Sequence, residues 1–169
     1  MVTHIPLTPL ELCRSPADES DVANNRLLYL TSNDWDLLNR SLKRLTYNLG
    51  EEIIREGSFG DRFCIIRSGE ARVELAGPRK RAVLAYLGPD DICGDMAFLE
   101  RGCFTASVIA SESKVEVDEI PATELQSLFE SFPRLAHRFY RSLALVLTRR
   151  LRETSKALAK EISANEGLR

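Results

Sequence analysis

Glycines break the stretch 44–120 into short segments, and this punctuation limits the fold more than any other feature of the sequence. The segments suited to β-strands are 46–49, 52–55, 62–67, 71–75, 81–87, 105–111 and 114–120. In the last segment Val115, Val117 and Ile120 stand among acidic residues, a mostly alternating pattern that indicates a strand with one buried face. Many short strands at regular spacing indicate an antiparallel sandwich or jelly roll.

Apolar residues at helical intervals occur both before and after the predicted strands. Candidate N-cap residues at 31–34 precede regularly spaced apolar residues, which predicts a helix over 33–43. Pro121 suits the first position of a second helix, Pro133 marks a break, and a long helix is predicted over 134–163. We therefore predict a mainly β protein with flanking helices. Its antiparallel β-roll or jelly roll (double-stranded β-helix) is capped by an N-terminal helix and two C-terminal helices.

The chain length suits one compact domain, because 169 residues can bury a sizeable core without disulfides or metals. Residues 1–30, which carry three of the seven prolines, are predicted to be a flexible or loosely docked arm. Residues 31–169 are predicted to be one domain. It has a helical lead over 31–45, a β-roll over 46–120 and C-terminal helices over 121–169.

Composition excludes several classes of protein. A net charge of −2 gives no global attraction to nucleic acid or to anionic membranes, and no apolar run reaches the roughly 18 residues of a membrane span. Residues 1–20 lack a signal-peptide core. The four cysteines show no Cys-x-x-Cys spacing and only two histidines are present, so we expect no metal site, free thiols and a cytoplasmic protein.

Catalytic motifs are sparse. Residues 111–114 satisfy Ser-x-x-Lys, but they lie between two predicted strands and lack the companion motifs. No Gly-x-Ser-x-Gly element, glycine-rich dinucleotide loop or histidine near a plausible nucleophile is found. We therefore expect no catalytic residues, no cofactor and no enzyme activity.

The stretch 93–108 contains a candidate anion site. Gly94 allows a tight backbone approach, and 95–99 suit one short helical turn that begins at the acidic Asp95. Free backbone N–H groups beside a glycine at such a start form an anion cradle.

This stretch resembles the phosphate-binding cassette of the cyclic nucleotide-binding domain family, with matches at Gly94, Ala97, Ala106 and Val108. The glycine turns within 50–57, 60–66 and 68–73 also follow the family pattern, and the resemblance covers roughly 44–158. It implies a β-roll that takes cAMP or cGMP as its ligand. The cassette residues that it assigns to the ligand are Gly94, Asp95, Met96, Ala97, Phe104, Thr105 and Ala106.

Two positions depart from the family pattern. The glutamate that holds the ribose is Asp95 here, and the arginine that pairs with the cyclic phosphate is Phe104. Loss of such a partner at a desolvated site typically costs about 2–5 kcal/mol, so weak or absent binding of cAMP and cGMP is predicted. The alternative is a genuine cyclic-nucleotide sensor with a non-standard pocket. Arg101 is then the candidate substitute cation, and otherwise it is a solvent-exposed loop charge.

The long C-terminal helix adds two further expectations. By resemblance to the transcription-factor branch of the family, Thr154 and Ser155 contact the nucleotide base, and otherwise they are polar residues on a solvated helix. The helix is basic, with eight Lys or Arg and one acid from 134 to 160. No helix-turn-helix follows it in this sequence, so DNA binding is not expected.

The apolar stripe of this helix is longer than a small roll can cover. Thirty helical residues span about 45 Å, which leaves the region around 151–162 exposed unless a second copy covers it. We therefore predict a homodimer through Leu147, Leu151, Leu158 and Ile162. Overall, the sequence favours a non-catalytic regulatory module, with a dimer-forming adaptor or an unidentified protein partner as further alternatives.

Overall fold

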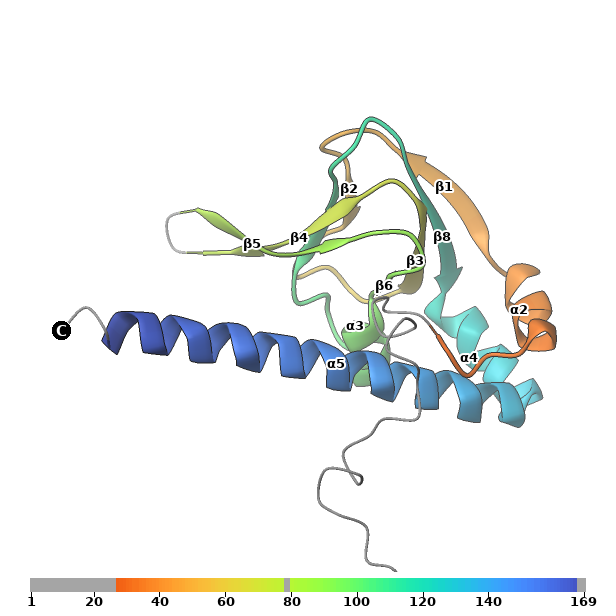
Figure 1. The fold of residues 1–169 in the computed structure, drawn as a ribbon. Helices are drawn as coiled ribbons and strands as arrows, with labels where there is room; N and C mark the ends of the chain where they lie inside the picture. Colours follow the sequence, from red (N-terminus) through yellow and green to blue (C-terminus); the bar gives the residue numbers. More distant parts are fainter. Residues whose placement is uncertain (1–26, 78–79, 167–169) are drawn as a thin grey trace, which may run out of the picture.

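A computed structural model describes residues 27–77 and 80–166 of the chain. In Figure 1 a β-roll sits above one long helix that extends well beyond it. The strands are β1 (Lys43–Tyr47), β2 (Glu52–Ile54), β3 (Arg62–Ser68), β4 (Ala71–Ala76), β5 (Arg81–Leu87), β6 (Ile92–Cys93), β7 (Ser107–Ala110) and β8 (Val115–Pro121). The helices are α2 (Ser32–Asn39), α3 (Asp95–Glu100), α4 (Ala122–Ser131) and α5 (Pro133–Glu166).

The strands form two four-stranded antiparallel sheets, in the orders β1-β8-β3-β6 and β2-β7-β4-β5. Consecutive strands such as β6, β7 and β8 alternate between the sheets, which is how a jelly roll closes on itself. The predicted roll with flanking helices is therefore confirmed.

Strand β3 separates two apolar layers. Phe63 and Ile65 face a cluster shared with the helices, while Cys64 and Ile66 face the interior of the roll. Successive side chains of a strand point to opposite faces, and here both faces are buried. This explains why the apolar run from Phe63 to Ile66 is uninterrupted. The roll interior also holds Phe104, which is 4% exposed.

Helix α2 begins with a capping box between Thr31 and Asp34, as its N-cap residues predicted. It ends at Asn39, earlier than the predicted residue 43, because the chain turns there and enters β1. Pairing with β8 starts at Lys43, opposite Glu119, so β1 begins three residues before the predicted strand. The two-residue strand β6 was not predicted, since so short a segment has no periodicity.

The described end of the N-terminal segment is docked on α5. Leu27 is buried, the Tyr29 N–H donates to Oγ of Ser142 at 2.9 Å, and the Arg141 guanidinium lies 3.9 Å from the Tyr29 ring centroid. The rest of the predicted arm, residues 1–26, lies outside the described residues.

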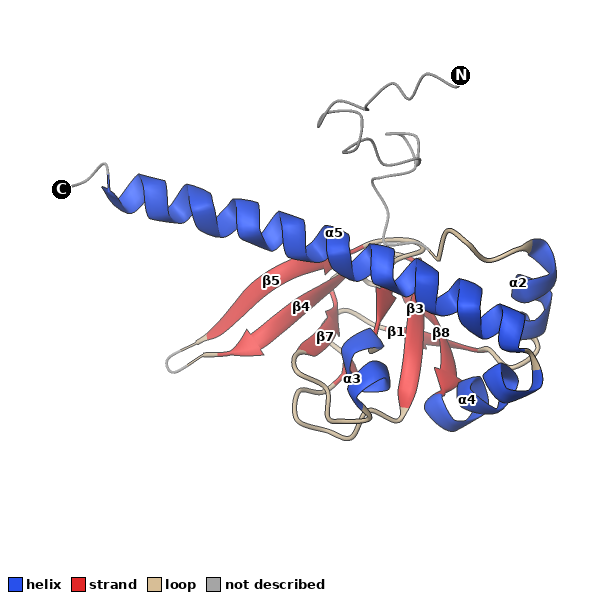
Figure 2. Cartoon of the chain, turned by 90° about the horizontal axis from the view of Figure 1, so that it is seen from below, coloured by secondary structure: helices blue, strands red, loops and turns tan. Residues whose placement is uncertain are grey.

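Two elements project from the roll on the same side, the β4–β5 hairpin and the C-terminal half of α5 (Figures 1 and 2). In the hairpin, β5 is exposed from Arg81 to Tyr86, and in α5 every residue from 151 to 164 is exposed. Within the described residues, no helix is both long and apolar enough to span a membrane.

Candidate ligand site in the cassette

The cassette begins where β6 passes into α3 through Gly94. This residue has a φ of +82°, and a Cβ placed on it would lie 2.7 Å from the Arg62 carbonyl oxygen and 3.3 Å from the Phe104 ring. Only glycine combines that left-handed backbone with so close an approach. The sequence therefore places α3 directly beside β3 and Phe104.

The far end of the cassette is held by pairing with the turn after β2. The N–H of Phe104 donates to the Ser58 carbonyl at 2.9 Å, and the N–H of Gly57 donates back to the Phe104 carbonyl at 2.8 Å. A bridge between Phe59 and Cys103 continues this pairing. These bonds fix the backbone so that the Phe104 ring points into the roll, where it joins the buried cluster.

The cassette encloses a small cavity of about 100 Å³. The structure brings to it every cassette residue that the sequence singled out, namely Gly94, Asp95, Met96, Ala97, Phe104, Thr105 and Ala106. Ile54, Val73 and Val108 complete its apolar wall. Pockets for small molecules usually measure about 300–1,000 Å³, so this space is too small for one as it stands.

The cation at this cavity is Arg150 of α5, a residue that the sequence analysis did not assign. Its Nη1 donates to Oδ2 of Asp95 at 2.7 Å, and its Nη2 donates to the Ile92 carbonyl at 2.6 Å. The Asp95 side chain is 6% exposed and the Arg150 side chain 28%, so the pair is largely shielded from water. The signal was present in the sequence, because Arg150 falls seven residues after Leu143, on the apolar face of the helix.

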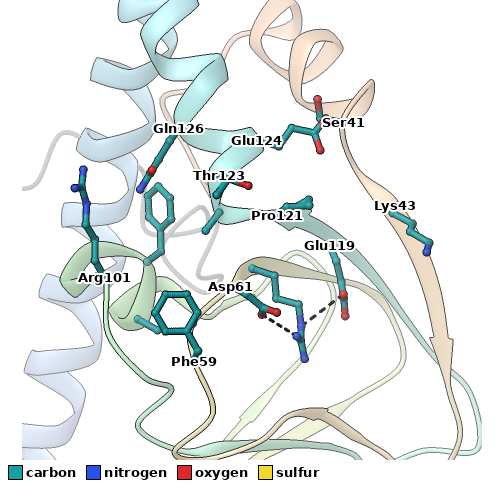
Figure 3. Close-up of a pocket in the computed structure, with 15 residues that line it drawn as sticks. Ser41, Lys43, Phe59, Asp61, Arg101, Glu119, Pro121, Thr123, Glu124 and Gln126 are labelled. Carbon is teal, nitrogen blue, oxygen red and sulfur yellow. Dashed lines mark hydrogen bonds and ion pairs between the residues drawn. The ribbon is translucent and has the colours of Figure 1, made fainter.

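Arg101, the predicted substitute cation, lies elsewhere. It follows α3 with a φ of +52° and lines a separate cavity with Phe59 and Phe98 (Figure 3). The structure therefore separates it from the cassette cavity and brings Arg150 there instead.

Thr154 and Ser155 are exposed on the projecting part of α5 and do not line the cassette cavity. The Thr154 hydroxyl donates to the Arg150 carbonyl at 2.9 Å, which is an ordinary bond within a helix. In this chain the structure does not bring either residue to the cassette.

The predicted dimer residues divide into two groups. Leu147 is partly buried and packs against the cluster between α5 and the roll, so it covers the core. Leu151, Leu158 and Ile162 are 68%, 55% and 52% exposed. They form an apolar face that is not covered by any other part of the chain that the structure describes.

Comparison with known proteins agrees with this geometry. Residues 44–132, more than half of the chain, match the cyclic nucleotide-binding domain family. The chain is 32% identical to cyclic GMP-binding protein C of Dictyostelium discoideum over 76% of its length. It is 31% identical to the cyclic AMP receptor protein of Thermus thermophilus, also over 76% of its length. The chain belongs to the cyclic nucleotide-binding domain family.

Solved structures give the same result for the fold. The catabolite activator protein of Thermus thermophilus superposes with a TM-score of 0.65 at 30% identity, covering 77% of this chain and 59% of that one. A cyclic nucleotide-binding domain from Methylobacillus flagellatus gives a TM-score of 0.73 at 22% identity, covering 78% of this chain and 74% of that one. The chain spans only 5% of the Dictyostelium protein and 58% of the Thermus receptor.

Proposed function

We propose that this chain is a non-catalytic regulatory module that binds cAMP and cGMP weakly or not at all. The observation that carries the proposal is the Phe104 ring, 4% exposed, in a cassette whose remaining cavity measures about 100 Å³. A nucleotide would need that ring to move, and removing it from the apolar cluster costs burial free energy.

The charges of the cassette support the same proposal. Asp95 and Arg150, the groups that would meet a ribose and a phosphate, already satisfy each other. A ligand would have to replace a shielded, charge-assisted hydrogen bond before gaining one of its own. In this state α5 is held against the roll by the protein itself, and the module would act through its surface and through α5.

Isothermal titration calorimetry with cAMP and cGMP tests the proposal, with 5′-AMP as the non-cyclic control. We expect a dissociation constant weaker than about 10 μM for both cyclic nucleotides, a binding free energy less favourable than about −7 kcal/mol. A tighter value for either one, with 5′-AMP weaker, would overturn the proposal.

The second candidate is a genuine cyclic-nucleotide sensor with a non-standard pocket. Arg150 favours it, because a guanidinium at the cavity is the cation that a phosphate requires. Relatives named as a cyclic GMP-binding protein and a cyclic AMP receptor point the same way. If calorimetry finds tight binding, Arg150→Ala should abolish it under this hypothesis.

We also propose that the exposed face of α5 is covered by a second copy of the chain, in the cytoplasm. Leu151, Leu158 and Ile162 follow one another at intervals of seven and four, which places them along one side of the helix. Thr154 and Ser155 lie within about 60° of the same side, so in a dimer they would flank the interface. A dimer-forming adaptor that has no nucleotide ligand is the corresponding alternative role, as is the capture of another protein.

A further inference from the structure

A second and larger cavity lies on the other side of α3 from the small cassette cavity. It measures about 690 Å³ and is formed by the start of β1, the turn before β3, helix α3 and the first turn of α4 (Figure 3). This volume falls within the usual range of about 300–1,000 Å³ for small-molecule sites. Ala97 lines both cavities, so α3 is the wall between them.

The middle of this cavity is apolar. Phe59 and Phe98 contribute rings, and Ala97, Pro121 and Ala122 contribute aliphatic surface. The backbone of Phe59 is fixed by its bridge to Cys103, yet its side chain is 68% exposed. An exposed ring on a fixed backbone can stack against a flat aromatic ligand. Such aromatic pairs contribute binding free energy beyond that of the area they bury.

The charged groups around this apolar centre are not equivalent. Arg62 is compensated, since its Nη1 donates to Oδ1 of Asp61 at 2.9 Å and its Nε lies 3.6 Å from Oε2 of Glu119. The backbone N–H of Arg101 donates to the Ala97 carbonyl, but its guanidinium has no ion pair or hydrogen bond to another described residue. Figure 3 shows Arg101 on the same side of the cavity as Gln126, whereas Lys43, a further lining cation, lies on the far side.

We propose that this cavity binds a small aromatic carboxylate. The ring lies in the slot between Phe59 and Phe98, and the carboxylate accepts hydrogen bonds from the Arg101 guanidinium, whose planar fork matches a carboxylate. The amide of Gln126 supplies a further donor beside Arg101.

This site is independent of whether the cassette accepts a cyclic nucleotide. Its ligand would nevertheless contact α3, the helix that carries Asp95, through Ala97 and Phe98. A small molecule bound in this cavity would therefore contact α3, the helix whose Asp95 is bonded to Arg150 of α5.

A titration of the full chain with 2-naphthoate, followed by ¹H–¹⁵N chemical-shift changes, tests the proposal. We expect saturable shifts in residues 97–101 and 122–126, with a dissociation constant of about 1 mM or tighter, as ordinary ligand efficiency gives for a molecule of this size. Shifts that saturate instead at residues 131–138, which line a different apolar cavity, or the absence of saturable shifts would overturn the proposal.

Two variants and one neutral probe identify the contacts. Arg101→Gln should weaken 2-naphthoate about tenfold, while Arg152→Gln, an exposed arginine on α5, should leave it unchanged. Phe59→Ala removes a largely exposed ring and should also weaken binding. Equal affinity of wild type for 2-naphthalenemethanol, or unchanged affinity in both site variants, would overturn the assignment.

Discussion

Arg150 and Asp95 are joined by a hydrogen bond of 2.7 Å although 55 residues separate them in the sequence. The bond connects α5 to α3, and Arg150 also donates to the Ile92 carbonyl at the end of β6. One side chain of the long helix thus contacts both elements that begin the cassette. This contact defines where α5 leaves the roll, because every residue from 151 to 164 is exposed.

Arg150→Ala should loosen α5 from the cassette. The change leaves the shielded carboxylate of Asp95 without its partner, which we expect to cost about 1–3 kcal/mol in the free energy of unfolding. Urea denaturation measures the loss, and hydrogen exchange should accelerate for amides around 143–150. Arg152→Ala removes an exposed arginine two positions further on and should change neither quantity. If Arg150→Ala is as stable and as protected as Arg152→Ala, the contact does not hold the helix.

Phe104→Arg should increase the affinity for cAMP. The substitution removes the buried ring and supplies a cation for the phosphate, a charge-assisted contact worth about 2 kcal/mol or more, so a gain of about 30-fold or more is expected. Calorimetry on the folded variant measures it. Phe104→Ala, which opens space and adds no charge, is the matched control. An equal gain in both variants would mean that volume, and not charge, limits binding in wild type.

The ion pair between Asp34 and Arg138 should make stability depend on pH. The hydrogen bond from Arg138 lowers the pKa of the Asp34 carboxyl from its ordinary value of 3.8 to about 2, and the side chain is 3% exposed. A carboxyl whose pKa is lower in the folded state stabilises the fold above its unfolded pKa. That contribution is lost as the pH falls from about 4 through 2.

Asp34→Asn should therefore cost on the order of 1–2 kcal/mol at pH 7, and the difference from wild type should shrink as the pH approaches 2. Urea unfolding at pH 7, 4 and 3 measures the trend. Asp36→Asn changes an exposed carboxyl of the same helix and should cost little at any pH. A cost for Asp34→Asn that is the same at pH 7 and pH 3 would contradict the assignment.

Leu151→Asp should dissociate the proposed dimer. A carboxylate on the exposed apolar face would have to be buried without a partner when two copies pair, and this is strongly unfavourable. Sedimentation or light scattering should show a dimer for wild type and a monomer for the variant. Ala157→Asp, which lies about 120° away around the helix, should remain dimeric. A monomeric wild type at concentrations of tens of micromolar would remove the basis of this prediction.

Gly94→Ala should destabilise the cassette more than Gly88→Ala. A Cβ at Gly94 meets the Arg62 carbonyl at 2.7 Å and requires a φ of +82°, whereas a Cβ at Gly88 meets no atom within 4 Å. We expect a loss of about 2 kcal/mol or more for Gly94→Ala, and of about 0.5 kcal/mol or less for Gly88→Ala. Thermal unfolding of the two variants measures the difference, and equal effects would show that the cassette turn relaxes freely.

Local patterns in the sequence were enough to predict the architecture. The alternation in β8 and the glycine turns predicted the strands, and the N-cap residues before Trp35 predicted α2. These features are readable because they depend on neighbours along the chain. The matches at Gly94, Ala97, Ala106 and Val108, together with three glycine turns within 50–73 that agree with the same family pattern, likewise predicted the cassette.

Tertiary structure alone decided which charged groups meet. Arg150 lies on α5 and Asp95 on α3, and their meeting depends on the angle at which α5 crosses the roll, which no local pattern records. Arg101 is much closer to Asp95 in sequence, yet the turn after α3 directs it into the larger cavity. The sequence by itself determined the roll, the cassette and the missing arginine at Phe104. Packing decided that Phe104 fills the cavity and that Arg150 is the cation beside it, because both depend on contacts between distant segments.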